Sequence, residues 1–159
     1  MDILNLFLDY IRWYHFGVVS PRFEAIDNPL LYVSKFKESL NDEHKKIVFE
    51  TACDVGNLDI INLFIDSENI NIGMAISARR GDHDLVQLFI DRGANNWNEC
   101  MILSCRGGYD DLTMKFIEKG ADDCHSGFCS AKTEKMRHYF RQKLSEIQTC
   151  SDDGYGSLH

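Results

Sequence analysis

The most constraining feature of this sequence is a segment that recurs at a short, nearly constant interval. Two small residues, a glycine, an aspartate and an apolar run appear in the same order three times. The glycine of each copy is Gly56, Gly81 or Gly108, so the copies lie 25 and 27 residues apart (81 − 56 and 108 − 81). Self-similarity at a short fixed period is typical of proteins built from stacked repeats.

Each copy predicts two short helices joined by a glycine turn. Small residues near the end of the first helix let helices approach closely; they are Ala52, Cys53, Ser77, Ala78, Ser104 and Cys105. The glycine supplies the left-handed backbone that ends a helix. The aspartate three positions later suits the first turn of the next helix, where negative charge is favoured.

The second helix of each copy carries one apolar stripe. Leu85, Leu88 and Phe89 are at helical spacing in the middle copy, and Leu112 and Phe116 follow the same spacing in the next. A Gly-Ala pair beginning at Gly93 or Gly120 then ends the helix. Because a single helix pair cannot bury its stripe alone, we expect an all-α solenoid in which neighbouring pairs stack.

The order small-small-x-x-Gly-x-x-Asp-Leu/Ile-Val/Ile-x-Leu-Phe-Ile-x-x-Gly-Ala-Asn/Asp, over residues 47–122, resembles the ankyrin repeat. The Thr-Pro-Leu-His start of that repeat is absent here, and the period is shorter than the ankyrin value of ~33. The shortening falls after Asn95, where only Asn96, Trp97 and Asn98 connect two units. No residues remain there for the β-hairpin finger of ordinary ankyrin arrays.

Finger-less units with a Gly-Ala-Asn-x-Trp-Asn connector resemble the ankyrin-like arrays of large cytoplasmic DNA viruses, such as the multigene families of African swine fever virus. The resemblance implies a viral, non-enzymatic protein that acts in the host cytoplasm. It further implies that the chain binds and restrains a host protein, in innate defence signalling.

The pattern predicts a single repeat domain over residues 1–148. It comprises an N-terminal cap (1–40), repeats at about 42–70, 71–97 and 98–123, and a C-terminal cap (124–148). Residues 149–159 are Ser-, Asp- and Gly-rich and are expected to be disordered. Asn41 is a candidate N-cap for a helix that reaches about Asp54.

The two caps are predicted from amphipathic patterns. Residues 1–16 place Ile3, Phe7, Tyr10, Ile11 and Tyr14 on one face. A membrane-surface or partner-binding helix is the alternative to a cap, but the polar face lacks the lysines of a membrane anchor. We expect a loop over 17–29 and a short helix over 30–40. Its anchors are Leu31, Phe36 and Leu40, and those of a helix over 133–148 are Met136, Phe140, Leu144 and Ile147.

The composition narrows the class of partner and the compartment. The formal net charge of −8 argues against nucleic acid as the main partner, because phosphate binding needs a basic face. No run approaches the ~20 apolar residues of a membrane span, and the start lacks the basic lead of a signal peptide. Six cysteines without a secretory signal indicate thiols in a reducing compartment. We therefore expect a cytoplasmic protein without a membrane association.

Cysteine density in residues 100–129 makes this stretch the one candidate metal site. Cys100, Cys105, Cys124 and Cys129 offer enough sulfur ligands for tetrahedral zinc. Their spacing departs from a Cys-x2-Cys knuckle, however, and Cys105 stands where the repeat requires a small buried residue. We expect neither a metal nor another cofactor; a zinc-stabilised scaffold is the alternative. No catalytic motif appears, so the chain is not expected to be an enzyme.

The repeat predicts where a partner binds. In ankyrin-like arrays the first helices line the concave face, and outward positions here are Ile76, Arg79, Arg80, Leu103 and Arg106. Arginine beside apolar side chains is favoured at interface centres, whereas the alternative is that these arginines only solvate an open face. Trp97 in the connector is a second candidate, either as an exposed anchor, as a brace between two units, or as part of a homodimer contact.

Overall fold

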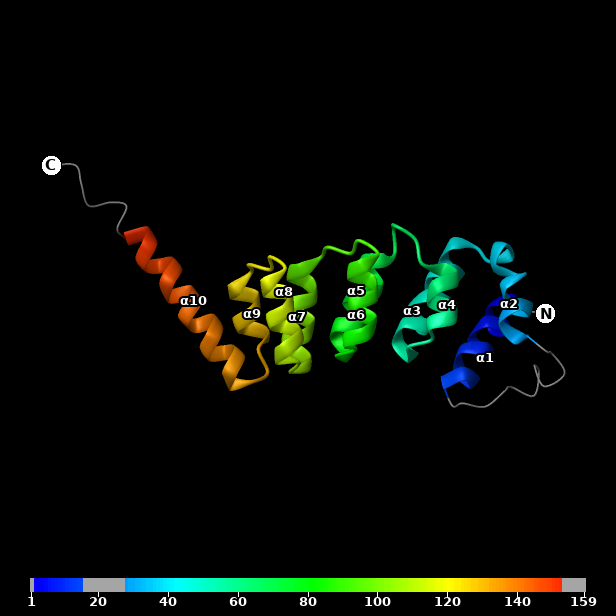
Figure 1. The fold of residues 1–159 in the computed structure, drawn as a ribbon, viewed down its shortest axis with the longest axis horizontal. Helices are drawn as coiled ribbons and strands as arrows, with labels where there is room; N and C mark the ends of the chain where they lie inside the picture. The colour runs from blue at the N-terminus through cyan, green and yellow to red at the C-terminus, as the bar shows by residue number, and fades with distance from the viewer. Residues whose placement is uncertain (1, 16–27, 153–159) are drawn as a thin grey trace. The chain divides into compact units, whose positions relative to one another are not determined.

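The computed structural model describes residues 2–15 and 28–152, and every regular element in these residues is a helix. The predicted all-α class is confirmed. The helices are α1 (Ile3–His15), α2 (Pro29–Ser34), the 3-10 turn η1 (Lys37–Ser39), α3 (Asp42–Val55), α4 (Leu58–Phe64), α5 (Ile70–Arg80), α6 (His83–Asp91), α7 (Trp97–Gly107), α8 (Asp110–Glu118), α9 (Cys124–Ser130) and α10 (Glu134–Asp152) (Figure 1). None of these helices has the length and apolar character needed to cross a membrane.

The glycine turns lie where the repeat places them. Gly56, Gly81 and Gly108 have φ angles of 76°, 76° and 84°, and Gly93 and Gly120 have 98° and 110°. These left-handed conformations carry a steric penalty for residues with a Cβ atom, which explains why glycine occupies all five positions. The repeat period is therefore set by a backbone requirement at each helix end.

The chain divides into two compact units. The first comprises Met1–Ser77 with Asp84–Ala94, and the second comprises Ala78–His83 with Asn95–His159, so the boundary passes through α5. A single domain with continuous stacking of all repeats remains a prediction.

The first unit is built on aromatic contacts between its helices. The ring of Phe7 in α1 meets that of Phe64 in α4 edge to face, with centroids 5.3 Å apart. Phe49 in α3 meets Phe89 in α6 in the same way at 6.2 Å. Because α1 packs on α3 and buries Phe7 and Ile11, its apolar face covers the neighbouring helix, in the manner of a cap. The side chain of Tyr14 lies outside the described residues.

The segment after α1 differs from the prediction. Residues 17–27 of the expected loop lie outside the described residues, and Pro29 already begins α2. Leu31 was predicted as an anchor, but its side chain is 57% exposed, and Val33 is buried instead. Asn28 caps α2 and accepts a hydrogen bond from the Leu31 amide, which fixes the start of the helix. Helix α2 packs on α1 and α4, and this packing covers Val33 rather than Leu31. Of the other two anchors, Leu40 is buried and Phe36 is half-buried.

The helix pairs follow the predicted pattern in detail. The Asn41 side chain accepts a hydrogen bond from the His44 amide at 2.7 Å and caps α3, as predicted. The six small residues of the repeats are all buried. Along the second-helix stripes, Leu85, Phe89, Leu112 and Phe116 are buried; Leu88 is half-buried.

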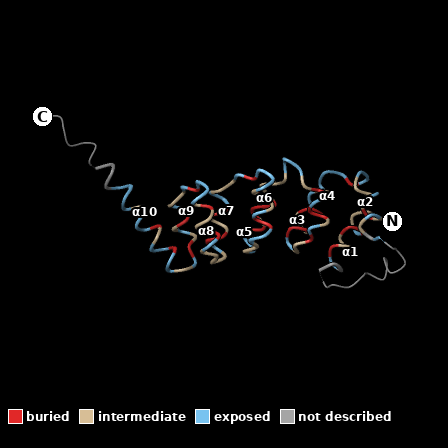
Figure 2. Tube along the Cα trace, in the orientation of Figure 1, coloured by how far each residue is buried: buried red, intermediate tan, exposed pale blue. Residues whose placement is uncertain are grey.

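The second unit ends in two helices of very different length. Helix α7 packs on α8 and α9, and α9 packs on α10. Because α9 has 7 residues and α10 has 19, α9 covers only the first turns of α10. Met136 and Phe140 are buried as predicted, Leu144 is half-buried, and Ile147 is 58% exposed, so its assignment as a core anchor was wrong. Figure 2 shows the change from buried to exposed residues along α10.

Helix α10 also extends farther than predicted. It reaches Asp152, so residues 149–152, which were expected to be disordered, are helical. Residues 153–159 of the expected disordered tail lie outside the described residues.

Candidate functional site

Most of the predicted docking residues gather at one end of two helices in the second unit. Arg79 and Arg80 are exposed in the last turn of α5, and Arg106 is exposed in the last turn of α7. Leu103 is half-buried one turn before Arg106. Ile76, also half-buried, belongs to the part of α5 in the first unit. We call Arg79, Arg80, Leu103 and Arg106 the arginine face.

A tyrosine that the sequence reading did not single out holds the two helix ends of this face. A Cβ atom on Gly81 would lie 2.4 Å from the Tyr109 ring, and one on Gly107 would lie 2.3 Å from it. The half-buried ring is therefore wedged between two glycines. Arg80 precedes Gly81 and Arg106 precedes Gly107, so each arginine is next to a glycine that touches the ring. An aromatic residue after the repeat glycine was the available signal.

The carbonyl end of α7 is already satisfied without Arg106. The Ser104 carbonyl accepts hydrogen bonds from the amides of Gly108 and Tyr109, at 3.0 Å each. The Cys105 carbonyl accepts from the amides of Gly108 and Lys132, at 3.1 and 3.2 Å. The Lys132 ammonium donates to the Gly107 carbonyl at 3.4 Å. The guanidinium of Arg106 is thus not needed to cap this helix.

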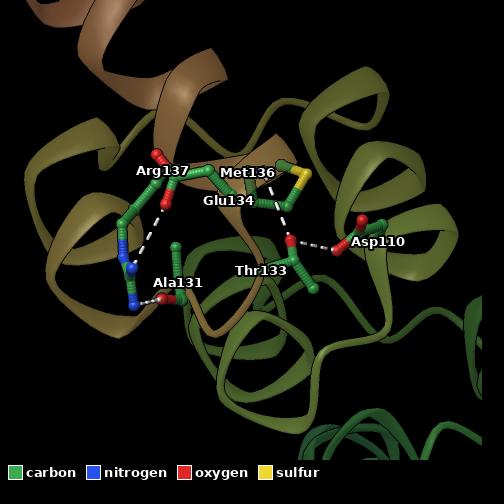
Figure 3. A network of polar contacts seen from close by, with 6 residues as sticks. All are labelled: Asp110, Ala131, Thr133, Glu134, Met136 and Arg137. Atoms are coloured by element: carbon green, nitrogen blue, oxygen red, sulfur yellow. Dashed lines mark hydrogen bonds and ion pairs between the residues drawn. The ribbon is translucent and has the colours of Figure 1, made fainter.

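Lys132 is held at this position by a polar network around the connector between α9 and α10 (Figure 3). The Thr133 hydroxyl donates to the Asp110 carboxylate at 2.8 Å and accepts from the Met136 amide at 3.2 Å. Arg137 donates to the Ala131 carbonyl at 3.2 Å. The connector is therefore fixed on both sides of Lys132, and the Asp110 carboxylate has a partner other than Arg106.

The net charge is distributed unevenly between the two units. The first unit has 7 Lys and Arg against 14 Asp and Glu, a net charge of −7. The second has 10 Lys and Arg against 11 Asp and Glu, a net charge of −1. Within the described part of the chain, Arg80 and Arg106 have no ion pair or side-chain hydrogen bond. The arginine face is therefore a basic surface on an almost neutral unit.

Trp97 does not belong to the arginine face. It is half-buried and begins α7, whereas Arg106 lies in the last turn of the same helix. At 1.5 Å per residue, the two are separated by roughly 14 Å along the helix axis. The sequence grouped them as candidates, and the structure places them at opposite ends of one helix.

Asn98, which the sequence reading treated only as part of the connector, makes the contacts that join α7 to the next connector. Its side-chain oxygen accepts hydrogen bonds from the amides of Asp122 and Asp123, at 2.8 and 3.0 Å. Its amide group donates to the Asp122 carboxylate at 3.0 Å. One side chain thus links two connectors where no β-hairpin finger is present. Asn71, 27 residues earlier, has the equivalent place in the sequence and was the signal for this role.

The cysteines do not fit a zinc site. Burial, together with the charge of Glu99, raises the pKa of the Cys100 thiol to about 12. Burial also raises the pKa of Cys105 and of Cys124. Zinc binds the thiolate, so these shifts oppose metal binding. In residues 2–15 and 28–152, no three His, Cys, Asp or Glu side chains come together as a possible metal site.

The first unit contains a groove of about 520 Å³ between η1, the start of α3 and the connector after α4. Its floor includes Phe64, and the Lys37 ammonium lies 5.5 Å from the centre of that ring. On the wall, Lys45 pairs with Asp42 at 3.7 Å. The cationic groups of the groove are thus engaged within the protein, and nothing in it favours a ligand of one charge.

Comparison with known proteins identifies no relative, because no family model, curated protein or solved structure matches the chain.

Proposed function

We propose that this protein is a non-enzymatic, ankyrin-like protein-interaction module that binds its partner through the arginine face. The observation that supports this most is the pair of exposed arginines, Arg80 and Arg106, set at two helix ends that touch the same Tyr109 ring. Basic residues in a last turn ordinarily stabilise the helix dipole by about 0.3–1 kcal/mol. At the end of α7, however, the carbonyls of Ser104, Cys105 and Gly107 already accept hydrogen bonds from backbone amides or from Lys132. The helix therefore does not need the Arg106 side chain as a cap, and we propose that it binds the partner.

The chemistry of the face suits a protein partner. Arginine is enriched at the energetic centres of interfaces, since its planar fork makes several directional hydrogen bonds. Leu103 adds a half-buried apolar side chain one turn away from Arg106. A charged group next to an apolar one matches the composition of interface centres better than that of a purely solvated surface.

The partner we propose is a host protein of the cytoplasm, in innate defence signalling. The support is the finger-less repeat, which resembles viral arrays, and the lack of a disulfide at the described cysteines, which suits a reducing compartment; these are Cys53, Cys100, Cys105, Cys124 and Cys129. Viral origin is part of this proposal.

Cross-linking followed by mass spectrometry in transfected cytosol tests the proposal. We expect the wild type to capture a specific protein and the triple variant Arg79→Glu, Arg80→Glu, Arg106→Glu to lose it. Lys119→Glu is the matched control, because Lys119 is exposed at the C-cap of α8 and its reversal costs the same kind of dipole interaction. Circular dichroism must show equal helicity in all three proteins. Equal capture by the triple variant would remove the arginine face from consideration.

The homodimer and zinc-scaffold alternatives predict different observations. A homodimer through Trp97 would appear in light scattering of the purified protein at micromolar concentration. A zinc scaffold would contain near-stoichiometric metal. We expect monomer and no bound zinc, since no three His, Cys, Asp or Glu side chains of the described residues come together as a possible metal site.

A further inference from the structure

We infer that the arginine face recognises an acidic segment of its protein partner, with Arg80 and Arg106 each binding a carboxylate. This inference rests on the proposed function and adds the chemistry of the partner. It follows from what the structure leaves unsatisfied at the two helix ends.

No group of the protein in the described residues pairs with Arg80 or Arg106. Two acidic residues are next to the Tyr109 wedge in the sequence, since Asp82 follows Gly81 and Asp110 follows Tyr109. The Asp110 carboxylate accepts the Thr133 hydroxyl at 2.8 Å (Figure 3), and in the described residues neither carboxylate pairs with Arg80 or Arg106. The carbonyl end of α7 accepts hydrogen bonds from backbone amides and from Lys132. Arg106 is exposed and has no ion pair in the described residues, and the same holds for Arg80. Both guanidinium groups are available to an external anion.

Arg80 and Arg106 are each next to a glycine that contacts Tyr109. Tyr109 touches Gly81 and Gly107, which fixes the backbone beside each arginine. Arginines on a held backbone lose less backbone entropy on binding than arginines on mobile loops. A planar fork donates two parallel hydrogen bonds to a carboxylate, so arginine is better suited than lysine to this ligand.

The net charge of the chain does not prevent an acidic segment from binding at the arginine face. An acidic partner would be repelled by a protein of net charge −8, but that charge lies almost entirely in the first unit, at −7 against −1 for the second. The Debye length is about 8 Å at physiological salt. Charges within about 8 Å of the arginine face therefore affect the partner more than the net charge of the chain does. The acidic segment has carboxylates on both sides of an apolar side chain, and that apolar side chain contacts Leu103.

A peptide pair tests this inference. Two short fluorescein-labelled peptides share one sequence, except that a Glu-Glu-Leu-Glu-Glu core in the first is Gln-Gln-Leu-Gln-Gln in the second. Fluorescence anisotropy measures binding to the full chain. We expect the Glu peptide to bind and the Gln peptide to bind more weakly, by about twofold to thirtyfold, which is the range that two exposed ion pairs produce. We also expect the affinity for the Glu peptide to fall as salt rises.

Variants assign the binding to the two arginines. Arg80→Glu with Arg106→Glu should weaken the Glu peptide about tenfold or more, whereas Lys119→Glu should not. Arg80→Lys with Arg106→Lys keeps both charges but removes the planar guanidinium groups. This variant should also bind the Glu peptide more weakly, by several-fold. Unfolding curves must match for all variants.

Specific results would overturn the inference. They are equal affinities for the two peptides, a loss of affinity in Lys119→Glu equal to that in the double Glu variant, or no binding of the Glu peptide up to a concentration of about 1 mM. Light scattering could instead show that the chain self-associates and that Arg80→Glu with Arg106→Glu abolishes this self-association. In that case the ligand of the arginine face would be the first unit of a second copy. If the triple variant loses cytosolic capture while both peptides bind equally, the proposed function stands and only the acidic partner is refuted.

Discussion

Substituting Gly73 by alanine should destabilise the first unit, although the same change stabilises most helices. Gly73 lies inside α5, where alanine is favoured over glycine by about 1 kcal/mol. A Cβ atom at this position would lie 2.3 Å from the Phe89 ring, and that ring is buried and packs against Phe49. A carbon–carbon contact needs about 3.5 Å, so the ring or the helix must move by roughly 1 Å.

The magnitude follows from the opposing terms. Overpacking a closed core costs about 1–3 kcal/mol, and the propensity gain offsets about 1 kcal/mol of it. We expect a net loss of up to about 2 kcal/mol in the free energy of unfolding. Urea titration followed by circular dichroism measures this loss as a lower midpoint with an unchanged slope.

A second substitution identifies the cause. Phe89→Leu alone should destabilise by loss of the ring contacts, but it should also make room for the methyl group of Gly73→Ala. The double variant should therefore be more stable than the sum of the two single effects by about 1 kcal/mol. Stabilisation by Gly73→Ala alone, or strict additivity in the double variant, would refute the steric explanation.

The remaining predictions concern the backbone, the connectors and the thiols. Gly93→Ala should cost about 1 kcal/mol although no atom lies near its Cβ position, because φ is 98°; urea midpoints measure this, and an unchanged midpoint would show that no strain arises. Asn98→Ala should lower the melting temperature through loss of three hydrogen bonds, and Asn98→Asp should lower it further by placing a carboxylate opposite Asp122. Raising the pH from about 8 to about 10.5 should reduce stability, because burial raises the pKa of Cys100 from 9.0 to about 12 and the unfolded chain then loses its proton first. Cys100→Ala should remove part of this slope, and Ellman's reagent should label exposed Cys129 long before Cys100; an identical pH slope or equal labelling rates would contradict the burial argument.

The outcome of the cap predictions shows how far local patterns reach. The periodicity of α10 places Met136, Phe140, Leu144 and Ile147 on one stripe, and the stripe exists. Whether a stripe is buried depends on the length of the helix that covers it, and α9 ends after 7 residues. Ile147 is consequently exposed. In the same way, packing of α2 on α1 and α4 buries Val33 and leaves Leu31 exposed, a choice that apolarity alone does not make.

The candidate site was predictable only in part. The outward positions of the first helices follow from the repeat, and Arg79, Arg80, Leu103 and Arg106 were found that way. Tyr109 was not found, because its role depends on two glycines, Gly81 and Gly107, of which one lies in another repeat. The groups that satisfy the carbonyl end of α7 were also hidden from the sequence, since Lys132 comes from a connector 25 residues away.

The sequence by itself determined the helix pairs and their ends. Glycine is required wherever φ is positive, Asn41 caps α3 through its own side chain, and small residues recur at each close approach; all of these are local effects written within a few residues. Tertiary structure alone decided which apolar residues are covered, how α7 is joined to the next connector through Asn98, and that Arg80 and Arg106 have no ion pair in the described residues. Those outcomes depend on distances between residues far apart in the chain, and no local pattern contains them.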